Sequence, residues 1–312
     1  MSANNEFDEK AFLPGGILVV DKPPDMSSAA VVRRIKRLPG IRKVGHAGTL
    51  DPFATGVLVC LVNQGTRLSQ FFLHGRKTYA ATLRLGRTTD TQDYTGAVTA
   101  EKPVDPIPEN IIYNVFSEYT GDILQTPPSY SALKHNGVPL YRHARAGRMI
   151  RKPDRAVNIS RIEVSDIRLP DITFEVECSG GTYIRTLCAD IGDTLGYGGH
   201  LLHLDRIESS GFTRKEAIGL ETLEEEAIAG RLERHVILMA DALKDMPSAE
   251  ADSRVQEKIR HGRALAAADL PALADASPKP FYARVTAPGN RLLAVIHVPE
   301  NNFDYRYCCV FH

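Results

Sequence analysis

The 312-residue chain is predicted to be an α+β protein. We expect a mixed, largely antiparallel sheet with flanking helices, followed by a small β-rich unit. Three observations predict this. Short apolar or alternating runs typical of strands outnumber the helical patterns. The length is large for one domain and favours two. No internal repeat or low-complexity tract indicates another architecture.

The N-terminal half begins with a polar, acidic segment, so residues 1–14 are expected to form a flexible arm. Strands are then expected at 16–21, 57–62 and 79–85, and a helix at 29–37. The first strand is apolar throughout and is followed by two prolines, whereas 79–85 alternates between apolar and polar residues. Ser27 or Ser28 can cap the helix through its hydroxyl group.

The second half continues the pattern, with strands expected at 157–164 and 172–178, a helix from 182 to about 195, and a helical pattern over 220–242. The larger domain is therefore assigned to 15–244. Residues 245–253 are interpreted as a linker, and 254–312 as the second domain. In that domain, strand-like runs at 281–286 and 291–296 flank an Ala-Pro-Gly-Asn turn, which predicts a hairpin.

The charge is balanced overall but not along the chain. Lys+Arg and Asp+Glu number 38 each, so the net charge does not indicate a nucleic-acid partner. Two basic clusters nevertheless contain almost no acid: residues 33–43, and residues 142–155 with Asp154 alone opposing. Four glutamates at 221–226 offset part of this charge on what reads as a separate helix. We expect the two clusters to contact phosphates.

Cysteines and termini indicate a reduced, cytoplasmic protein. The five cysteines form no C-x-x-C pair and no zinc spacing with histidine. Cys60 and Cys188 lie in apolar runs and are expected in the core, whereas the adjacent Cys308 and Cys309 could oxidise. The first ten residues are polar and unlike a secretory signal, and no apolar run approaches the ~20 residues of a membrane span.

The most informative segment is 45–58, GHAGTLDPFATGVL, which places one carboxylate among three glycines. Glycine permits backbone angles that other residues resist. Pro52 fixes its own φ and pushes Asp51 toward an extended conformation. A lone Asp-Pro pair would be an ordinary turn. The length and specificity of this segment instead indicate a reactive Asp51 on a rigid loop.

This segment resembles the GHxGTLDPxATGxL signature of the TruB family of tRNA pseudouridine synthases, in which the Asp is catalytic. Three further segments resemble family motifs in the same order: KPPDMSS at 22–28, TPPSYSALK at 126–134 and CSGGTYIRTL at 178–187. The resemblance implies the pseudouridine synthase fold and an isomerase that acts on the uridine at position 55 in the tRNA T-loop. It also implies a 122–155 insertion that closes over the RNA and a PUA-type RNA-binding domain at 254–312.

The chemistry of this isomerisation requires a group that acts near C1′ or C6 of uridine, a partner that keeps this group ionised, and a pocket for the detached base. Asp51 is the candidate for the reactive group, with attack at C1′, attack at C6 and a glycal-like path all open. A buried carboxylate tends to take up a proton unless an opposite charge lies close. Arg185, in the GTYIR motif, is the predicted partner because a guanidinium can grip a carboxylate bidentately. No metal or organic cofactor is required, and no motif for one is present.

Other site residues are assigned by the resemblance. Tyr79 is the third catalytic candidate: it would stack on the target base and assist proton transfer, although a tyrosine at a strand start more often serves in packing. His46 would fill the hole that a flipped base leaves in the stack. Asp93 and Tyr183 would lie near the nucleotide, and Leu204 would form a hydrophobic floor. Candidates for contact with the RNA backbone are Lys22, Arg67, Lys134, Arg142 and Arg145.

One position departs from the family pattern. Asp205 stands where relatives commonly carry a second arginine, and it would either weaken phosphate attraction or pair with Arg206. Three functions stay open at this point. The first is a stand-alone, monomeric enzyme for the T-stem-loop of tRNA, with no obligate protein partner. The second is a guide-RNA-dependent enzyme for ribosomal RNA. The third is an RNA-binding or RNA-folding protein without catalysis.

Overall fold

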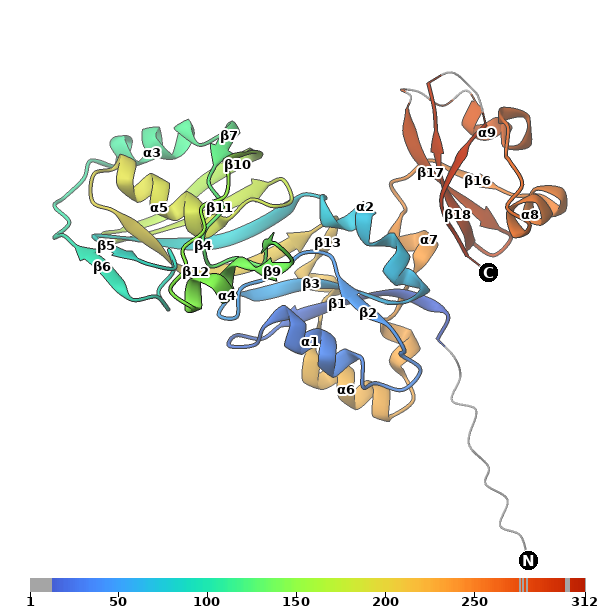
Figure 1. Ribbon diagram of the computed structural model, residues 1–312, viewed down its shortest axis with the longest axis horizontal. Helices are drawn as coiled ribbons and strands as arrows, with labels where there is room; N and C mark the ends of the chain where they lie inside the picture. Colours follow the sequence, from blue (N-terminus) through green and yellow to red (C-terminus); the bar gives the residue numbers. More distant parts are fainter. Residues whose placement is uncertain (1–12, 275, 277, 279, 301–303, 312) are drawn as a thin grey trace, which may run out of the picture.

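The structure is a computed structural model that describes residues 13–274, 276, 278, 280–300 and 304–311. Its larger part is built on an 11-stranded sheet with the main order β14-β1-β3-β12-β4-β11-β10-β7 (Figure 1). These strands, with β2, β13 and β15 at the side, are β1 (Gly15–Lys22), β2 (Val44–His46), β3 (Thr55–Asn63), β4 (Lys77–Leu85), β7 (Gly121–Gln125), β10 (Arg155–Arg168), β11 (Asp171–Cys178), β12 (Gly199–Ser209), β13 (Phe212–Thr213), β14 (Ile218–Gly219) and β15 (Ile237–Leu238). Most pairs are antiparallel, but β1–β14 and β3–β12 are parallel, which confirms the predicted mixed α+β class.

Helices cover the sheet in two groups (Figure 1). The helices of this part are α1 (Ser28–Ile35), α2 (Ser69–Leu73), α3 (Glu109–Glu118), α4 (Leu140–Arg145), α5 (Ile184–Thr194), α6 (Leu220–Ile228) and α7 (Met239–Ala242), with short 3-10 turns η1 (Gln64–Leu68), η2 (Arg214–Glu216) and η3 (Leu232–His235). Small hairpins are formed by β5 (Arg87–Thr89) with β6 (Val98–Glu101) and by β8 (Lys134–His135) with β9 (Val138–Pro139). Helices α3 and α5 pack on the β4–β11 end, and α1 and α6 lie together over β1 and β3.

The centre of the sheet brings together the segments that carry chemistry. Strand β12 joins β3 through a short parallel pairing of Asp205 with Thr55 and of Arg206 with Gly56, and it joins β4 along its length. Gly56 has φ +97°, and a Cβ there would lie 2.3 Å from the Arg206 carbonyl oxygen, so only glycine allows this approach. The 47–54 loop before β3 is therefore fixed directly above β12 and β4.

Most of the predicted elements are confirmed. The strands expected at 16–21, 57–62, 79–85, 157–164 and 172–178 lie within β1, β3, β4, β10 and β11. Ser27 caps α1 by accepting a hydrogen bond from the amide of Ala30 at 3.2 Å. All five cysteines are free thiols, and Cys60 and Cys188 are fully buried as expected. Residues 1–12 of the predicted arm fall outside the described residues, whereas Leu13 is buried under α1.

Three expectations need correction. The helix expected from 182 begins at Ile184, because Tyr183 is extended with φ −100° and ψ 108°. The helical pattern at 220–242 is broken into α6, η3, β15 and α7, because Gly230 adopts φ +73°. The predicted linker at 245–253 is partly a strand, since Ser248–Glu250 forms β16, which pairs in parallel with β17.

The C-terminal part is a small β-rich domain. Its four-stranded sheet contains β16, β17 (Phe281–Ala287), β18 (Arg291–Val298) and β19 (Arg306–Val310), next to α8 (Ser253–Arg260), η4 (Ala267–Asp269) and α9 (Pro271–Ala274). The pairing of β17 with β18 confirms the predicted hairpin. Its relation to a PUA domain and to RNA binding stays a prediction. Within the described ranges, no helix is both long and apolar enough to cross a membrane.

Candidate active site

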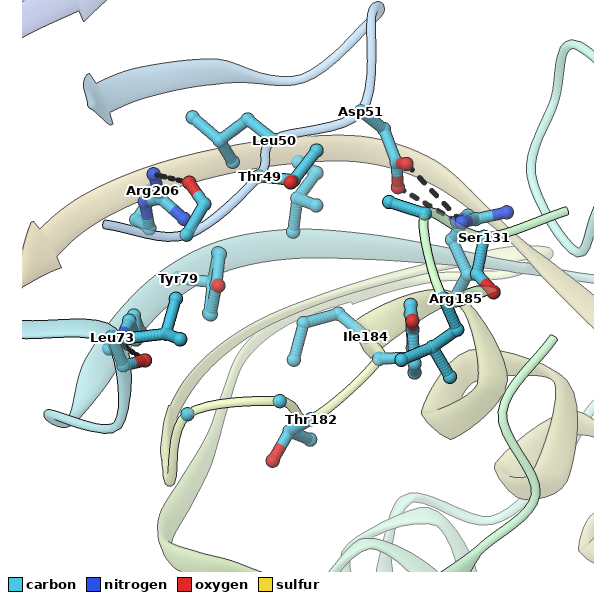
Figure 2. Close-up of a pocket in the computed structure, with 18 of the residues that line it drawn as sticks. Thr49, Leu50, Asp51, Leu73, Tyr79, Ser131, Thr182, Ile184, Arg185 and Arg206 are labelled. Atoms are coloured by element: carbon cyan, nitrogen blue, oxygen red, sulfur yellow. Dashed lines mark hydrogen bonds and ion pairs between the residues drawn. The ribbon is translucent and has the colours of Figure 1, made fainter. Parts of the chain in front are cut away.

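A pocket of about 410 Å³ opens above the junction of β3, β4 and β12 (Figure 2). Its walls include the loop before β3, the end of α2 and the start of β4, the segment that leads into α5, and the middle of β12. The insertion contributes Ser131, Ala132, Leu133 and Arg155. Asp51 and Arg185 face each other at one end of the pocket, with Tyr79 and Arg206 toward the other (Figure 2). The site thus unites segments that are far apart in the chain.

The loop that carries Asp51 is held on both sides of this residue. The Ser28 hydroxyl group accepts from the Leu50 amide at 2.8 Å and donates to the Leu50 carbonyl at 3.0 Å. Lys22 donates from its ammonium group to the Pro52 carbonyl at 2.9 Å. The amide of Ala54 closes the turn on the Asp51 carbonyl at 3.2 Å. These bonds fix the backbone of Asp51 from α1, from β1 and from its own turn.

Arg185 grips Asp51, as the sequence predicted. Its Nε lies 2.8 Å from Asp51 Oδ2, and its Nη2 donates to Asp51 Oδ1 at 3.2 Å. The same guanidinium lies 3.4 Å from Asp93 Oδ2 through Nη1, and it donates to the carbonyls of Thr91 at 2.8 Å and Tyr130 at 3.0 Å. Two guanidinium nitrogens thus face the two carboxylate oxygens of Asp51, and the Nη2 contact has the geometry of a hydrogen bond whereas the Nε contact is an ion pair without it. The Arg185 side chain is only 4% exposed, whereas the Asp51 side chain is 30% exposed, so the guanidinium is enclosed and the carboxylate remains accessible.

The environment of Asp51 sets opposing influences on its pKa. Burial raises the pKa of Asp51 most, the guanidinium of Arg185 lowers it, and the negative charge of Asp93 raises it again. Without Arg185 the carboxyl group would be driven further toward its neutral form. Arg185 is therefore the feature that makes a buried carboxylate available for chemistry.

Tyr79 lies at the pocket floor with Arg206 beside it. Tyr79 is 8% exposed, and burial raises the pKa of its hydroxyl group, which therefore stays protonated at neutral pH. Arg206 is 1% exposed and donates to the Val57 carbonyl at 2.7 Å and the Gly48 carbonyl at 3.2 Å. A ring at this position can cover a flat base, and Arg206 holds the glycine-rich loop above it.

Arg206 and Lys77 are pocket cations that the sequence did not predict there. Arg206 was considered only as a partner of Asp205, but Asp205 instead accepts from the Thr55 hydroxyl group at 2.7 Å and pairs with Arg214. Successive side chains of a strand point to opposite faces, which separates Asp205 from Arg206. Lys77 is buried and donates to the carbonyls of Leu73 at 2.8 Å and Gly75 at 2.7 Å. The alternation along 199–209 was a signal that could have found Arg206.

Some of the other predicted site residues line the pocket, and others lie outside it. Tyr183 and Leu204 line the pocket with Asp51, Tyr79 and Arg185. Asp93 adjoins it through Arg185. His46 ends strand β2, opposite Cys60, and is not among the lining residues; burial lowers the pKa of its imidazole. Its role beside a flipped base stays a prediction.

One of the predicted RNA-backbone contacts is wrong. Lys22 is fully buried and donates to the carbonyls of Pro23, Met26 and Pro52, so it supports the Asp51 loop and cannot reach a phosphate. Arg67 is exposed, donates to the Val310 carbonyl and lies 5.2 Å from the centre of the Phe311 ring, so it contacts the C-terminal domain. Its contact with RNA stays a prediction, as do those of Lys134, Arg142 and Arg145, which are exposed on the insertion.

The pocket presents several groups that can act on a substrate: one oriented carboxylate, one phenol ring and several buried cations. Together they can hold a flat, uncharged nucleobase next to a carboxylate that acts as a nucleophile or as a proton acceptor. Among the residues that the structure describes, no three His, Cys, Asp or Glu side chains are grouped as metal ligands would be.

Comparison with known proteins identifies the family of this chain. Residues 36–184 match the TruB family pseudouridylate synthase N-terminal domain, and residues 185–247 match the tRNA pseudouridylate synthase B C-terminal domain. The tRNA pseudouridine synthase B of Syntrophotalea carbinolica is 42% identical over 95% of this chain and 98% of that protein. The protein of the same name from Geobacter sulfurreducens is 42% identical over 79% of this chain and 81% of that protein.

Solved structures show the same architecture. A chain in the crystal structure of a Cbf5-Nop10-Gar1 complex superposes with a TM-score of 0.73 and 26% identity, covering 95% of this chain and 85% of that one. A chain of an H/ACA RNP bound to a substrate RNA gives a TM-score of 0.72 and 25% identity over the same shares. From the identity to its relatives and the family models together, the chain belongs to the TruB family and is a pseudouridine synthase.

Proposed function

We propose that this chain isomerises uridine to pseudouridine at position 55 in the T-loop of tRNA, as a stand-alone, monomeric and cofactor-free enzyme of the cytoplasm. The observation that carries the proposal is the Asp51–Arg185 pair, with 2.8 Å between Nε and Oδ2, in a pocket that also holds Tyr79. The base exchanges only protons in this reaction: it loses one and gains one. The C1′–N1 bond breaks, a C1′–C5 bond forms, the C5 hydrogen leaves as a proton, and N1 gains one.

The residues of the pocket divide this work. Asp51 acts next to C1′ or C6 of a uridine that has left its stack, and Arg185 keeps the Asp51 carboxylate charged until it reacts. Tyr79 and Leu204 enclose the base, so that it can rotate without leaving once it is detached. Attack at C1′, attack at C6 and a glycal-like path all begin from this arrangement.

The choice of tRNA rests on the relatives. Those named tRNA pseudouridine synthase B reach 42% identity over almost the whole chain, against 26% for the chain of the Cbf5-Nop10-Gar1 complex. The insertion supports a stem-loop substrate, because its residues Ser131 to Leu133 form a wall of the pocket while Arg142 and Arg145 stay exposed nearby in the chain. Single-stranded loops are the RNA elements that can offer an unstacked base to such a pocket.

The test uses the purified chain and an unmodified tRNA transcript, with no other protein or RNA. Pseudouridines are mapped by carbodiimide modification and primer extension, and a transcript with cytidine at position 55 serves as the control. We expect one new stop, at position 55, which the control lacks. Modification that needs added proteins and a guide RNA would favour the guide-dependent alternative. Binding without any modification would favour an RNA-folding protein.

A further inference from the structure

Arg155 is a positively charged residue of the pocket, and two of its guanidinium nitrogens lack hydrogen-bond acceptors in the described ranges. It lines the same pocket as Asp51, at the start of β10. Its Nε and Nη2 atoms are enclosed, and neither has a hydrogen-bond acceptor within the described part of the chain. Enclosed donors of a charged group that lack an acceptor cost free energy, and native proteins leave few of them. The position of Arg155 therefore calls for a ligand.

The other arginine and lysine side chains that line the pocket are already committed. Arg185 binds Asp51, Asp93 and two carbonyl groups. Arg206 donates to the carbonyls of Val57 and Gly48, and Lys77 donates to three carbonyls at the end of α2 and just beyond it. Arg155 is thus the pocket cation, among the described residues, that can still take an anion.

The guanidinium of Arg155 is held in place without help from an anion. Arg155 pairs with Gln125 across the β7–β10 ladder. The buried amide of Gln125 donates to the Tyr183 carbonyl at 3.0 Å and accepts from the Tyr183 amide at 2.7 Å. The Tyr183 ring in turn lies 4.7 Å from the Arg155 Cζ atom, a cation–π contact. The site is therefore preorganised by the strand, the amide and the ring.

The acid next to Arg155 in the sequence has another partner, and a glycine lies beside the guanidinium. The neighbouring Asp154 accepts a hydrogen bond from the Thr126 hydroxyl group. Gly181 passes next to the guanidinium with φ +95°, and a Cβ at this position would lie 3.5 Å from Arg155 Cζ. A side chain here would fill space that a ligand can use. Gly181 and Arg155 thus line the pocket side by side, with no side chain of residue 181 between the guanidinium and the pocket.

We propose that Arg155 binds a phosphodiester group of the RNA next to the flipped uridine and thereby sets which nucleotide enters the pocket. A guanidinium offers two parallel donors that match a phosphate, which a point charge cannot imitate. Contacts to phosphates fix register without reading the sequence. The inference rests on the proposed function in one respect, namely that the substrate is RNA. It adds a binding residue and the chemical group that this residue recognises.

The experiment combines protein and RNA changes. T-stem-loop RNAs carry one neutral methylphosphonate at each linkage around the target in turn, and release of tritium from C5 of the target uridine is measured. Wild type is compared with Arg155→Gln, Arg155→Lys and the control Arg168→Gln. Arg168 lies on the same strand with a side chain that is 83% exposed, so its substitution removes the same charge far from the pocket.

We expect Arg155→Gln to raise KM about tenfold for the unmodified RNA and to change kcat less than about twofold. One methylphosphonate should raise KM of the wild type about tenfold but that of Arg155→Gln less than about twofold, because the contact is already lost. The KM of Arg155→Lys should lie between those of the wild type and Arg155→Gln. This variant replaces Arg155→Gln in the test if Arg155→Gln does not fold. Arg168→Gln should keep the full sensitivity of the wild type to that linkage.

The inference would be overturned if the increases in KM from the methylphosphonate and from Arg155→Gln multiplied at every linkage, because the two changes would then act independently. A fall in kcat with an unchanged KM would also overturn it, because Arg155 would then act only by supporting Tyr183. The proposed function fails in a different way, when the wild type releases no tritium from the unmodified RNA. In that case dissociation constants for the same set of RNAs still test the phosphate contact.

Discussion

Asp51 and Arg185 divide the chemistry of the pocket between them at the scale of single residues. The carboxylate is pushed toward neutrality by burial and by Asp93, and the guanidinium opposes both effects. Arg185 also bonds to the carbonyls of Thr91 and Tyr130, so its own position does not depend on Asp51. A shift in this balance changes the pH at which the carboxylate is available.

Replacement of Arg185 by lysine should therefore lower kcat by about 100-fold or more while RNA affinity changes little. It should also move the acidic limb of the kcat–pH profile to higher pH, because Arg185 lowers the pKa of Asp51. The acidic limb of Asp93→Asn should move to lower pH, because the charge of Asp93 raises the same pKa. Measurement of kcat across the pH range for both variants tests these shifts. An acidic limb that stays at the wild-type pH in both variants would contradict the account.

The sequence predicted the Asp51–Arg185 pair because both residues lie in long, specific segments. Arg206, Lys77 and Arg155 were not predicted as pocket residues, since each lies in a strand whose side-chain direction and neighbours depend on strand pairing. Lys22 shows the opposite error. It was expected to contact RNA because it is charged. In the fold, its ammonium group instead donates hydrogen bonds to three backbone carbonyls.

At the scale of elements, the Asp51 loop depends on bonds from β1 and α1. The buried ammonium group of Lys22 joins the end of β1 to Pro52, and Ser28 joins α1 to Leu50. Burial lowers the pKa of Lys22 to about 8, so the group still carries its proton at neutral pH. Three donated hydrogen bonds match the three hydrogens of an ammonium group.

The variant Lys22→Met should lower the free energy of unfolding by about 3 kcal/mol, because it leaves three enclosed carbonyls without a donor. Urea unfolding followed by circular dichroism measures this change. The exposed Lys36 on the turn after α1 offers a control, and Lys36→Met should change stability by less than about 0.5 kcal/mol. Equal stability of the two variants would show that Lys22 does not support the loop.

The insertion is the element that we expect to grip the RNA backbone. Arg142 and Arg145 are exposed there, whereas Arg34 of the first basic cluster is paired with Glu221 and Glu224 on α6. The double variant Arg142→Gln/Arg145→Gln should reduce the slope of log affinity against log salt by about 1.5. The variant Arg33→Gln/Lys36→Gln removes two exposed charges on the α1 side and should change it less. A larger effect from the α1 side would place the RNA there instead.

Element prediction succeeded where the local pattern and the fold agree. The alternating runs at 79–85 and 172–178 became the adjacent strands β4 and β11. It failed where pairing with distant strands decides the structure. Residues 248–250 look like a linker in the sequence but add a strand beside β17, and 220–242 looks helical but contains β15, which pairs with β1.

At the scale of the whole molecule, the two domains share a core. Leu292, Val295 and Phe311 from the C-terminal domain pack in one cluster with Phe72 and Leu243 of the larger part. The Phe71 and Tyr282 rings meet edge to face at 5.3 Å, and Arg284 donates to the Ala240 carbonyl at 2.6 Å. The C-terminal domain is therefore packed against the catalytic part and is not only tethered to it.

Removal of residues 248–312 should accordingly destabilise the catalytic part, because it exposes apolar side chains such as Phe72 and Leu243. We expect a lower melting temperature and concentration-dependent aggregation of the truncated chain, measured by calorimetry and light scattering. A truncated chain that melts at the wild-type temperature and stays dispersed would show that the shared cluster contributes nothing to stability.

The most direct test of the central claim measures tritium released from C5 of uridine in an unmodified tRNA transcript, with the wild type and with Asp51→Asn. Formation of the C1′–C5 bond expels this hydrogen, so the signal reports the reaction itself. We predict about one equivalent per tRNA from the wild type alone. Asp51→Asn should release none, while it binds the tRNA with an affinity within a few fold of the wild type. Turnover by Asp51→Asn, or silence of the wild type on a tRNA that it binds, would contradict the account.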